Sequence, residues 1–214
     1  LRPDMKDGVI KAVMFSAISA ANAKVYSLAK ENEEYAGMGT TMVAAVWMNQ
    51  DLHIINIGDS RLYVLDKHDA VQVTRDHTVT QHMVEIGKLT PEQALTHENR
   101  HQLTRAVGVG NTLDIDYQMV ELKDDQKVLL CSDGLTDMLS DEEITAVLSN
   151  GESAQDVASK LVKTALERGG KDNVTVMAAL LDVEETAIFA PIAAAMVGDT
   201  DADYEEEYRN SYGS

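Results

Sequence analysis

The 214-residue chain contains one cysteine, three prolines and few aromatic side chains, and its acidic residues outnumber its basic ones two to one. A single cysteine excludes an internal disulfide framework and suits a reducing compartment, so we expect a cytoplasmic protein. The net charge of −18 argues against nucleic acid as a partner, because phosphate backbones bind basic side chains. No apolar run reaches the ~18 residues of a membrane span, so no membrane partner is expected.

The chain has the length and the 44% hydrophobic content of one globular domain. It starts with Leu1-Arg2-Pro3 rather than Met, and no leader-like segment follows. This start predicts a piece of a longer chain. The composition changes near residue 183, which predicts a domain over 1–182 and an acidic C-terminal tail over 183–214. The tail combines an Ala-rich stretch with clustered carboxylates and is typical of a solvated end.

The first half of the chain predicts one long helix followed by short strands. Ile10, Met14 and Ile18 recur at helical spacing within residues 4–31. Ala12 and Val13 widen this apolar stripe, so the helix is expected to be well buried. Short β runs separated by polar turns then indicate an antiparallel meander. These runs are 41–48, 52–57, 62–65 and 71–73.

The second half begins with a polar insertion over 77–107, in which Thr90-Pro91 resembles a helix start. Residues 115–122 and 127–131 predict a hairpin. Ser140 opens a helix with a capping box, and Ser153 opens another. The apolar run over 174–181 is expected to be the last strand and a central one.

Three aspartates stand at predicted strand ends beside turn residues. Asp133 follows the strand over 127–131, Asp172 precedes the strand over 174–181, and Asp76 follows the strand over 71–73. If these strands are neighbours, the carboxylates converge, and Mg²⁺ or Mn²⁺ would relieve their repulsion. Two such ions can activate a water and hold a phosphoryl group. Each aspartate taken alone is better explained as a turn residue, because Asp is common in turns beside Gly, and spacing does not establish convergence.

Six short motifs appear in one order, and each is common alone but specific as a set. The chain thereby resembles the type 2C, metal-dependent (PPM) protein phosphatases, specifically the bacterial Ser/Thr phosphatases, over about residues 5–181. The motifs are Gly39-Thr40-Thr41, Gly58-Asp59-Ser60-Arg61, Thr74-x-Asp76-His77, Leu103-Thr104-Arg105-Ala106-Val107-Gly108, Ser132-Asp133-Gly134-Leu135 and Gly170-x-Asp172-Asn173-Val174-Thr175.

The resemblance implies an α+β fold, a four-layer α-β-β-α sandwich of two antiparallel sheets flanked by helices. It implies two to three Mg²⁺ or Mn²⁺ ions and hydrolysis of phosphoserine and phosphothreonine by metal-activated water. The partners would be phosphorylated proteins, substrates of a Ser/Thr kinase. By motif position Asp133 resembles the shared metal ligand, Asp172 the second ligand and Asp76 the ligand of a third, looser ion. Residues 78–104 resemble the flap beside the cleft, and Asp59 matches a motif taken as mainly structural.

The sequence departs from the family at its start. The family's phosphate-binding Arg and its bridging Asp belong to motifs that precede the helix over 4–31. Asp7-Gly8 opens this helix and does not match those motifs, so no catalytic residue is assigned. The chain is therefore expected to be a truncated or incomplete phosphatase lacking its N-terminal strand or strands. The alternative is a catalytically inactive, phosphatase-like binding or regulatory module.

Two further motifs suggest other enzyme classes. His97-Glu98-Asn99-Arg100-His101 matches H-E-x-x-H, in which a helix presents both histidines to zinc. This segment is polar on all sides and no further His follows it, so a zinc metallopeptidase is a minor alternative. Cys131 could suggest a cysteine phosphatase, but its acidic neighbours would raise the pKa of the thiol. A buried structural cysteine is the favoured interpretation.

Overall fold

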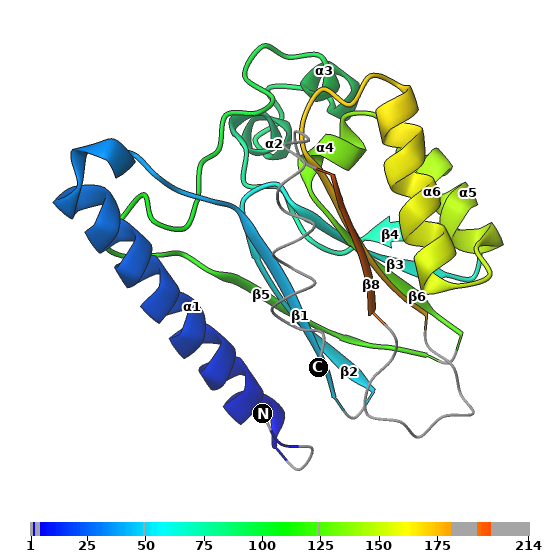
Figure 1. Ribbon diagram of the computed structural model, residues 1–214, viewed down its shortest axis with the longest axis horizontal. Helices are drawn as coiled ribbons and strands as arrows, with labels where there is room; N and C mark the ends of the chain where they lie inside the picture. Colours follow the sequence, from blue (N-terminus) through cyan, green and yellow to red (C-terminus); the bar gives the residue numbers. More distant parts are fainter. Residues whose placement is uncertain (1, 3–4, 49, 124, 181–191, 198–214) are drawn as a thin grey trace, which may run out of the picture.

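The computed structural model describes residues 2, 5–48, 50–123 and 125–180, together with the backbone of 192–197 (Figure 1). Two β-sheets face each other, with helix α1 (Asp7–Glu31) outside one sheet. Helices α5 (Asp141–Asn150) and α6 (Ala154–Glu167) lie outside the other. The expected α+β fold, a four-layer α-β-β-α sandwich, is therefore confirmed.

All neighbouring strands in both sheets run antiparallel. The first sheet has the order β1-β2-β5, and the second has the order β4-β3-β6-β7-β8. In the register, Ala45 lies opposite Ile54 and Leu129 opposite Ala178. The strand bounds are β1 Met42–Met48, β2 Asp51–Ile57, β3 Arg61–Asp66, β4 Asp69–Gln72, β5 Asp116–Glu121, β6 Lys127–Cys131, β7 Val174–Leu180 and β8 Ile192–Val197.

The predicted meander is divided between the two sheets. The chain leaves the first sheet at the end of β2 and enters the second at the start of β3. Gly58 allows this change of direction, since its φ is +105° and an added Cβ would lie 2.4 Å from the Thr41 side chain. The polar turn that the sequence shows here is a crossing between layers rather than a hairpin.

The predicted hairpin over 115–122 and 127–131 is wrong. Strand β5 pairs with β2, whereas β6 pairs with β3 and β7. Leu122 is buried in the core between the sheets, and the chain passes from the first sheet to the second between β5 and β6. A connection of this length can turn within a sheet or step between facing sheets, and its composition does not distinguish the two.

Three apolar cores separate the four layers. Ile55 and Ile57 pack beneath α1, whereas Leu52 and Ile54 face the core between the sheets. Every residue from 52 to 57 is buried, because both faces of β2 are covered. The third and largest core lies between the second sheet and helices α4 (Asp133–Thr136), α5 and α6. Its helical members include Val157, Leu161, Val162 and Ala165.

Helix α1 buries one face only. Ile10, Met14 and Ile18 are buried as expected, but Ala12 is exposed and Val13 is 41% exposed. The expectation of a well-buried helix is therefore wrong, because in the described structure the first sheet covers only one side of α1. By length and apolar composition alone, α1 also resembles a membrane span, a likeness that core helices share.

The polar insertion over 78–104 forms an excursion with a closed base. Thr78 bridges to Leu103, and the amide of Thr104 donates to the carbonyl of His77 at 2.8 Å. Within it lie α2 (Val79–Glu85) and α3 (Pro91–Leu95). Thr90 is the N-cap of α3, as the sequence predicts, and it also forms a capping box with Gln93. The segment starts immediately after Asp76-His77.

The second sheet continues past the strand that was expected to be the last. Strand β8 pairs with β7 and lies within 183–214, the segment predicted as an acidic tail. Pairing satisfies the edge of β7, whose backbone groups would otherwise face solvent. The clustered carboxylates of the predicted tail lie outside the described residues.

Candidate metal centre

Asp133 stands where a central strand of the second sheet ends. Strand β6 lies between β3 and β7 and ends at Cys131. Ser132 follows in an extended conformation, and Asp133 is the first residue of α4. Burial raises the pKa of the Asp133 carboxyl, and the negative charges of Asp172 and Asp137 raise it further.

The loop of Asp172 lies directly against the loop of Asp133. The amide of Ser132 donates to the carbonyl of Thr175 at 3.0 Å, and Ser132 Oγ accepts from the amide of Thr175 at 3.0 Å. A Cβ added to Gly134 would lie 2.4 Å from the carbonyl oxygen of Asn173. The structure thus brings the loops of Asp133 and Asp172 together at one edge of the sandwich.

Asp59 is an acidic neighbour that sequence reasoning took as mainly structural. It is 9% exposed and lies at the crossing between β2 and β3. Burial, followed by the charges of Asp133 and Asp76, raises the pKa of the Asp59 carboxyl to about 6. Asp59 could have been recognised as a candidate ligand from the sequence. It follows a strand and a glycine, and the other candidate aspartates also lie at strand ends beside turn residues.

The loop that carries Asp76 is fixed to the end of β2. The amide of Gly58 donates to His77 Nδ1 at 3.1 Å, and Asn56 Nδ2 donates to the carbonyl of Arg75 at 2.8 Å. The other ring nitrogen of His77 lies 3.0 Å from Asp116 Oδ2. Because Nδ1 accepts a hydrogen bond, Nε2 carries the proton that His77 donates to Asp116. These contacts hold the backbone of Asp76 in place.

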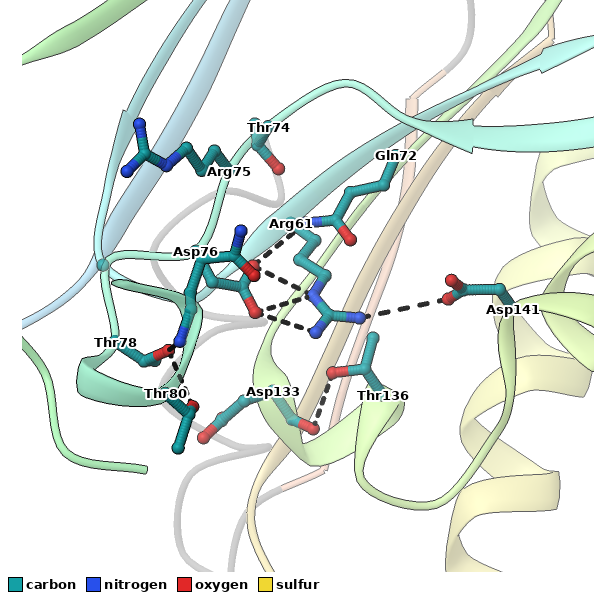
Figure 2. A network of polar contacts seen from close by, with 12 residues as sticks. Arg61, Gln72, Thr74, Arg75, Asp76, Thr78, Thr80, Asp133, Thr136 and Asp141 are labelled. Carbon is teal, nitrogen blue, oxygen red and sulfur yellow. Dashed lines mark hydrogen bonds and ion pairs between the residues drawn. The ribbon is translucent and has the colours of Figure 1, made fainter. Parts of the chain in front are cut away.

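The Asp76 carboxylate is already bound by side chains of the second sheet (Figure 2). Arg61 Nη2 donates to Oδ2 at 2.8 Å, and Arg61 Nε lies 3.0 Å from Oδ1 and 3.1 Å from Oδ2. Gln72 Nε2 donates to Oδ1 at 3.0 Å. The Asp76 carboxylate therefore has a guanidinium and an amide of the second sheet as partners.

The histidines of the H-E-x-x-H motif do not lie on one helix face. Helix α3 ends at Leu95, and residues 98–101 form turns. His97 Nδ1 accepts from the amide of Asn99 at 3.1 Å. His101 Nε2 lies 3.5 Å from Asp137 Oδ2. The segment thus approaches the acidic rim.

Cys131 has the buried position that favours a structural role. It is 3% exposed and belongs to the core beneath α4. Burial raises the pKa of its thiol to about 12, so the thiolate needed for a nucleophile is not populated near neutral pH.

The chemistry of the donor set fits a hard divalent cation. Asp133, Asp172 and Asp59 offer carboxylate oxygens, the ligands that Mg²⁺ and Mn²⁺ prefer. Within the described residues none of these three carboxylates forms an ion pair with Arg or Lys, whereas Asp76 is paired with Arg61. In the described part of the chain, no three His, Cys, Asp or Glu side chains form a ready-made metal cage. Water would therefore fill positions around an ion here, as is usual for Mg²⁺.

Known proteins resemble this chain along most of its length. Residues 3–181 match the sequence profile of the protein phosphatase 2C family. The serine/threonine protein phosphatase PstP of Mycobacterium tuberculosis is 36% identical over 202 residues, which cover 94% of this chain. The serine/threonine phosphatase stp of Listeria monocytogenes is 33% identical over 168 residues, or 78% of this chain. The matched region spans 39% of the length of PstP and 67% of the Listeria protein.

Solved structures agree with these sequence relatives. The catalytic domain of PstP, crystallised with two manganese ions, superposes with a TM-score of 0.74 at 35% identity. The superposition covers 84% of this chain and 75% of that one. The sandwich fold and the acidic edge are consistent with the profile match over residues 3–181. The chain belongs to the protein phosphatase 2C family.

Proposed function

We propose that this chain carries the ion-binding edge of a metal-dependent phosphatase that hydrolyses phosphoserine and phosphothreonine in proteins. The observation that carries the proposal is the contact between the loops of Asp133 and Asp172, with the raised pKa of Asp133. Acidic side chains held together against their repulsion are typical of cation sites.

Asp133 and Asp172 would hold Mg²⁺ or Mn²⁺, and Asp59 would add negative charge behind them. Bound ions would supply positive charge for the phosphoryl oxygens and activate water. The chain itself, with its net charge of −18, repels a phosphate. Binding of substrate therefore requires the ions, and metal-free protein should neither bind nor hydrolyse a phosphopeptide.

The named activities of the relatives support phosphoproteins as substrates, since PstP and stp are both serine/threonine protein phosphatases. We propose that a Ser/Thr kinase produces these substrates. The single cysteine supports a cytoplasmic location, because it requires no oxidising compartment.

Titration calorimetry with Mn²⁺ tests the proposal on this chain. We expect the protein to bind Mn²⁺, and Asp133→Asn and Asp172→Asn to weaken binding by about tenfold or more, since each removes a ligand. Asp156→Asn on the exposed surface of α6 is the matched control and should bind as the parent does. Equal Mn²⁺ binding by the parent and Asp133→Asn would refute the proposed site.

A non-catalytic binding or regulatory module is the second candidate. It is favoured by the lack of a ready-made three-ligand group within the described residues. A phosphopeptide assay with Mn²⁺, with and without EDTA, separates the two functions. Turnover that EDTA abolishes supports the enzyme, whereas Mn²⁺-dependent phosphopeptide binding without turnover supports the module.

A further inference from the structure

Arg61 is the basic side chain that pairs with Asp76. Its guanidinium contacts both oxygens of Asp76, and its side chain is 22% exposed against 14% for that of Asp76. Burial lowers the pKa of Arg61, but the ion pair with Asp76 more than offsets this, so the pKa is raised above its usual range. Arg61 is therefore charged at every pH at which the protein is folded.

The four directed contacts on Asp76 leave no ready position for a metal ion. A carboxylate has about four lone-pair sites. Arg61 Nε approaches both oxygens, Arg61 Nη2 takes Oδ2 and Gln72 Nε2 takes Oδ1. A Mg²⁺ ion needs an oxygen at about 2.0–2.1 Å, and it would also be repelled by the adjacent guanidinium.

Arg61 has a second carboxylate within reach on its opposite side. Figure 2 shows it between Asp76 and Asp141, the first residue of α5. Arg61 Nη1 donates to Tyr63 Oη at 3.0 Å and lies 3.9 Å from Asp141 Oδ1. Tyr63 Oη in turn donates to the same oxygen of Asp141 at 2.9 Å. The buried Tyr63 thus links the two possible positions of the guanidinium.

We propose that Arg61 and a divalent cation compete for Asp76, and that the ion binds there only when the guanidinium moves from Asp76 to Asp141. This inference rests on the proposed function, because it assigns Asp76 to a third ion. The site of Asp133 and Asp172 would bind its ion first, since in the described structure neither carboxylate is paired with a guanidinium as Asp76 is. Arg61 is thereby a positioning residue that sets the order in which the ions bind.

Mn²⁺ titration calorimetry of three variants tests the competition. Asp76→Asn alone should leave the first, tight phase of Mn²⁺ binding unchanged, because Arg61 already occupies that carboxylate. A second, weaker phase of Mn²⁺ binding would report the ion at Asp76. Arg61→Gln should strengthen this weaker phase by about tenfold or more, and the double variant Arg61→Gln/Asp76→Asn should lose that gain. No gain in Arg61→Gln, or a tight phase weakened in Asp76→Asn as much as in Asp133→Asn, would overturn the inference.

Asp141 provides an independent test of the second position. Asp141→Asn removes the carboxylate that would receive Arg61, so the weaker phase of Mn²⁺ binding should weaken further. Glu142→Gln is the matched control, because it changes the same charge in the same helical turn while Glu142 forms no ion pair with Arg61 in the described structure. Equal effects of the two substitutions would overturn the exchange between Asp76 and Asp141.

An NMR measurement keeps the inference testable if Arg61→Gln does not fold. The Nε–H resonance of Arg61 in the unmodified protein should shift when Mg²⁺ reaches the weaker phase, and it should not shift during the tight phase. A resonance unchanged up to saturation would overturn the inference. Failure of the proposed function is distinguished separately, because Asp133→Asn would then bind Mn²⁺ as the parent does.

Discussion

Asp59 and Cys131 are buried acids to which the fold assigns different roles. Burial raises the pKa of both groups, to about 6 for Asp59 and about 12 for Cys131. Asp59 lies near other carboxylates, so a bound cation can offset the energetic cost of burying its negative charge. Cys131 instead lies among apolar side chains. The aspartate therefore gives the protein a dependence on pH and ions, and the cysteine does not.

The metal-free protein should become less stable as pH rises through the range of about 4 to 6. The pKa of Asp59 is higher in the folded state than the ordinary aspartate value of 3.8, so the folded state binds the proton more tightly. Stability is gained as pH falls through about 6 and is lost as pH rises. The shift corresponds to at most about 3 kcal/mol.

Asp59→Asn should remove this dependence. In EDTA at pH 7 we expect the free energy of unfolding to rise by about 1–3 kcal/mol, with little change near pH 4. Urea denaturation across this pH range measures the difference, and the exposed Asp69→Asn is the control. A variant that is less stable than the parent at pH 7 would contradict the electrostatic account of Asp59.

Cys131 should be inert in the folded protein. At pH 8 a thiol reagent such as iodoacetamide should leave it unmodified, because burial keeps the thiolate population very low. In urea the same reagent should modify it completely. Rapid alkylation of folded protein, detected by mass spectrometry, would show that the strand end around Cys131 opens readily.

At the scale of secondary-structure elements, the contact between two loops depends on one glycine. Gly134 follows Asp133 at the start of α4, and the carbonyl of Asn173 lies where a side chain would begin. The loops that present Asp133 and Asp172 can approach each other only because position 134 has no Cβ. Spacing of the two aspartates is thus set by backbone packing.

Gly134→Ala should separate these loops. We expect a loss of about 2 kcal/mol or more in stability, because backbone rather than a flexible side chain must move, together with weaker Mn²⁺ binding. Gly8→Ala is the matched control, since nothing lies within 4 Å of its added Cβ and alanine favours the helix by up to about 1 kcal/mol. Unchanged stability and Mn²⁺ binding in Gly134→Ala would contradict the predicted clash.

Local signals predicted the helices, but the arrangement of strands required tertiary information. Ser140 forms the predicted capping box and Thr90 is the predicted N-cap, since capping depends on neighbours in the chain. The division of β5 and β6 between sheets depends on which distant strands they meet, and no local pattern encodes it. Asp133 and Asp172 were recognisable as strand-end residues, whereas the engagement of Asp76 by Arg61 depends on side-chain contacts that spacing does not reveal.

At the scale of the whole molecule, charge opposes folding. The net charge of −18 produces self-repulsion that salt screens and a bound cation partly neutralises. The family match and the fold were accessible from ordered motifs. The consequence of the excess negative charge follows only once the acidic edge is known. Cations bound at this edge would become part of the folded state.

Two kinds of cation should therefore stabilise the protein by separable routes. In EDTA, raising NaCl from low to moderate concentration should increase Tm for the parent and for Asp133→Asn alike, through screening. Micromolar Mn²⁺ should increase Tm for the parent only, as expected for a ligand that binds the folded state. Thermal denaturation followed by circular dichroism checks both, and a Mn²⁺ effect that persists in Asp133→Asn would indicate nonspecific screening.

The crossing at Gly58 has a consequence for how ion affinity should be interpreted. Asp59 stands where the chain passes from the first sheet to the second, whereas Asp133 and Asp172 belong to the second sheet alone. An ion bound by all three carboxylates would act as a cross-link between the two sheets. Substitutions of Ile54 or Leu62, deep in the core between the sheets, would then alter ion affinity without touching any carboxylate.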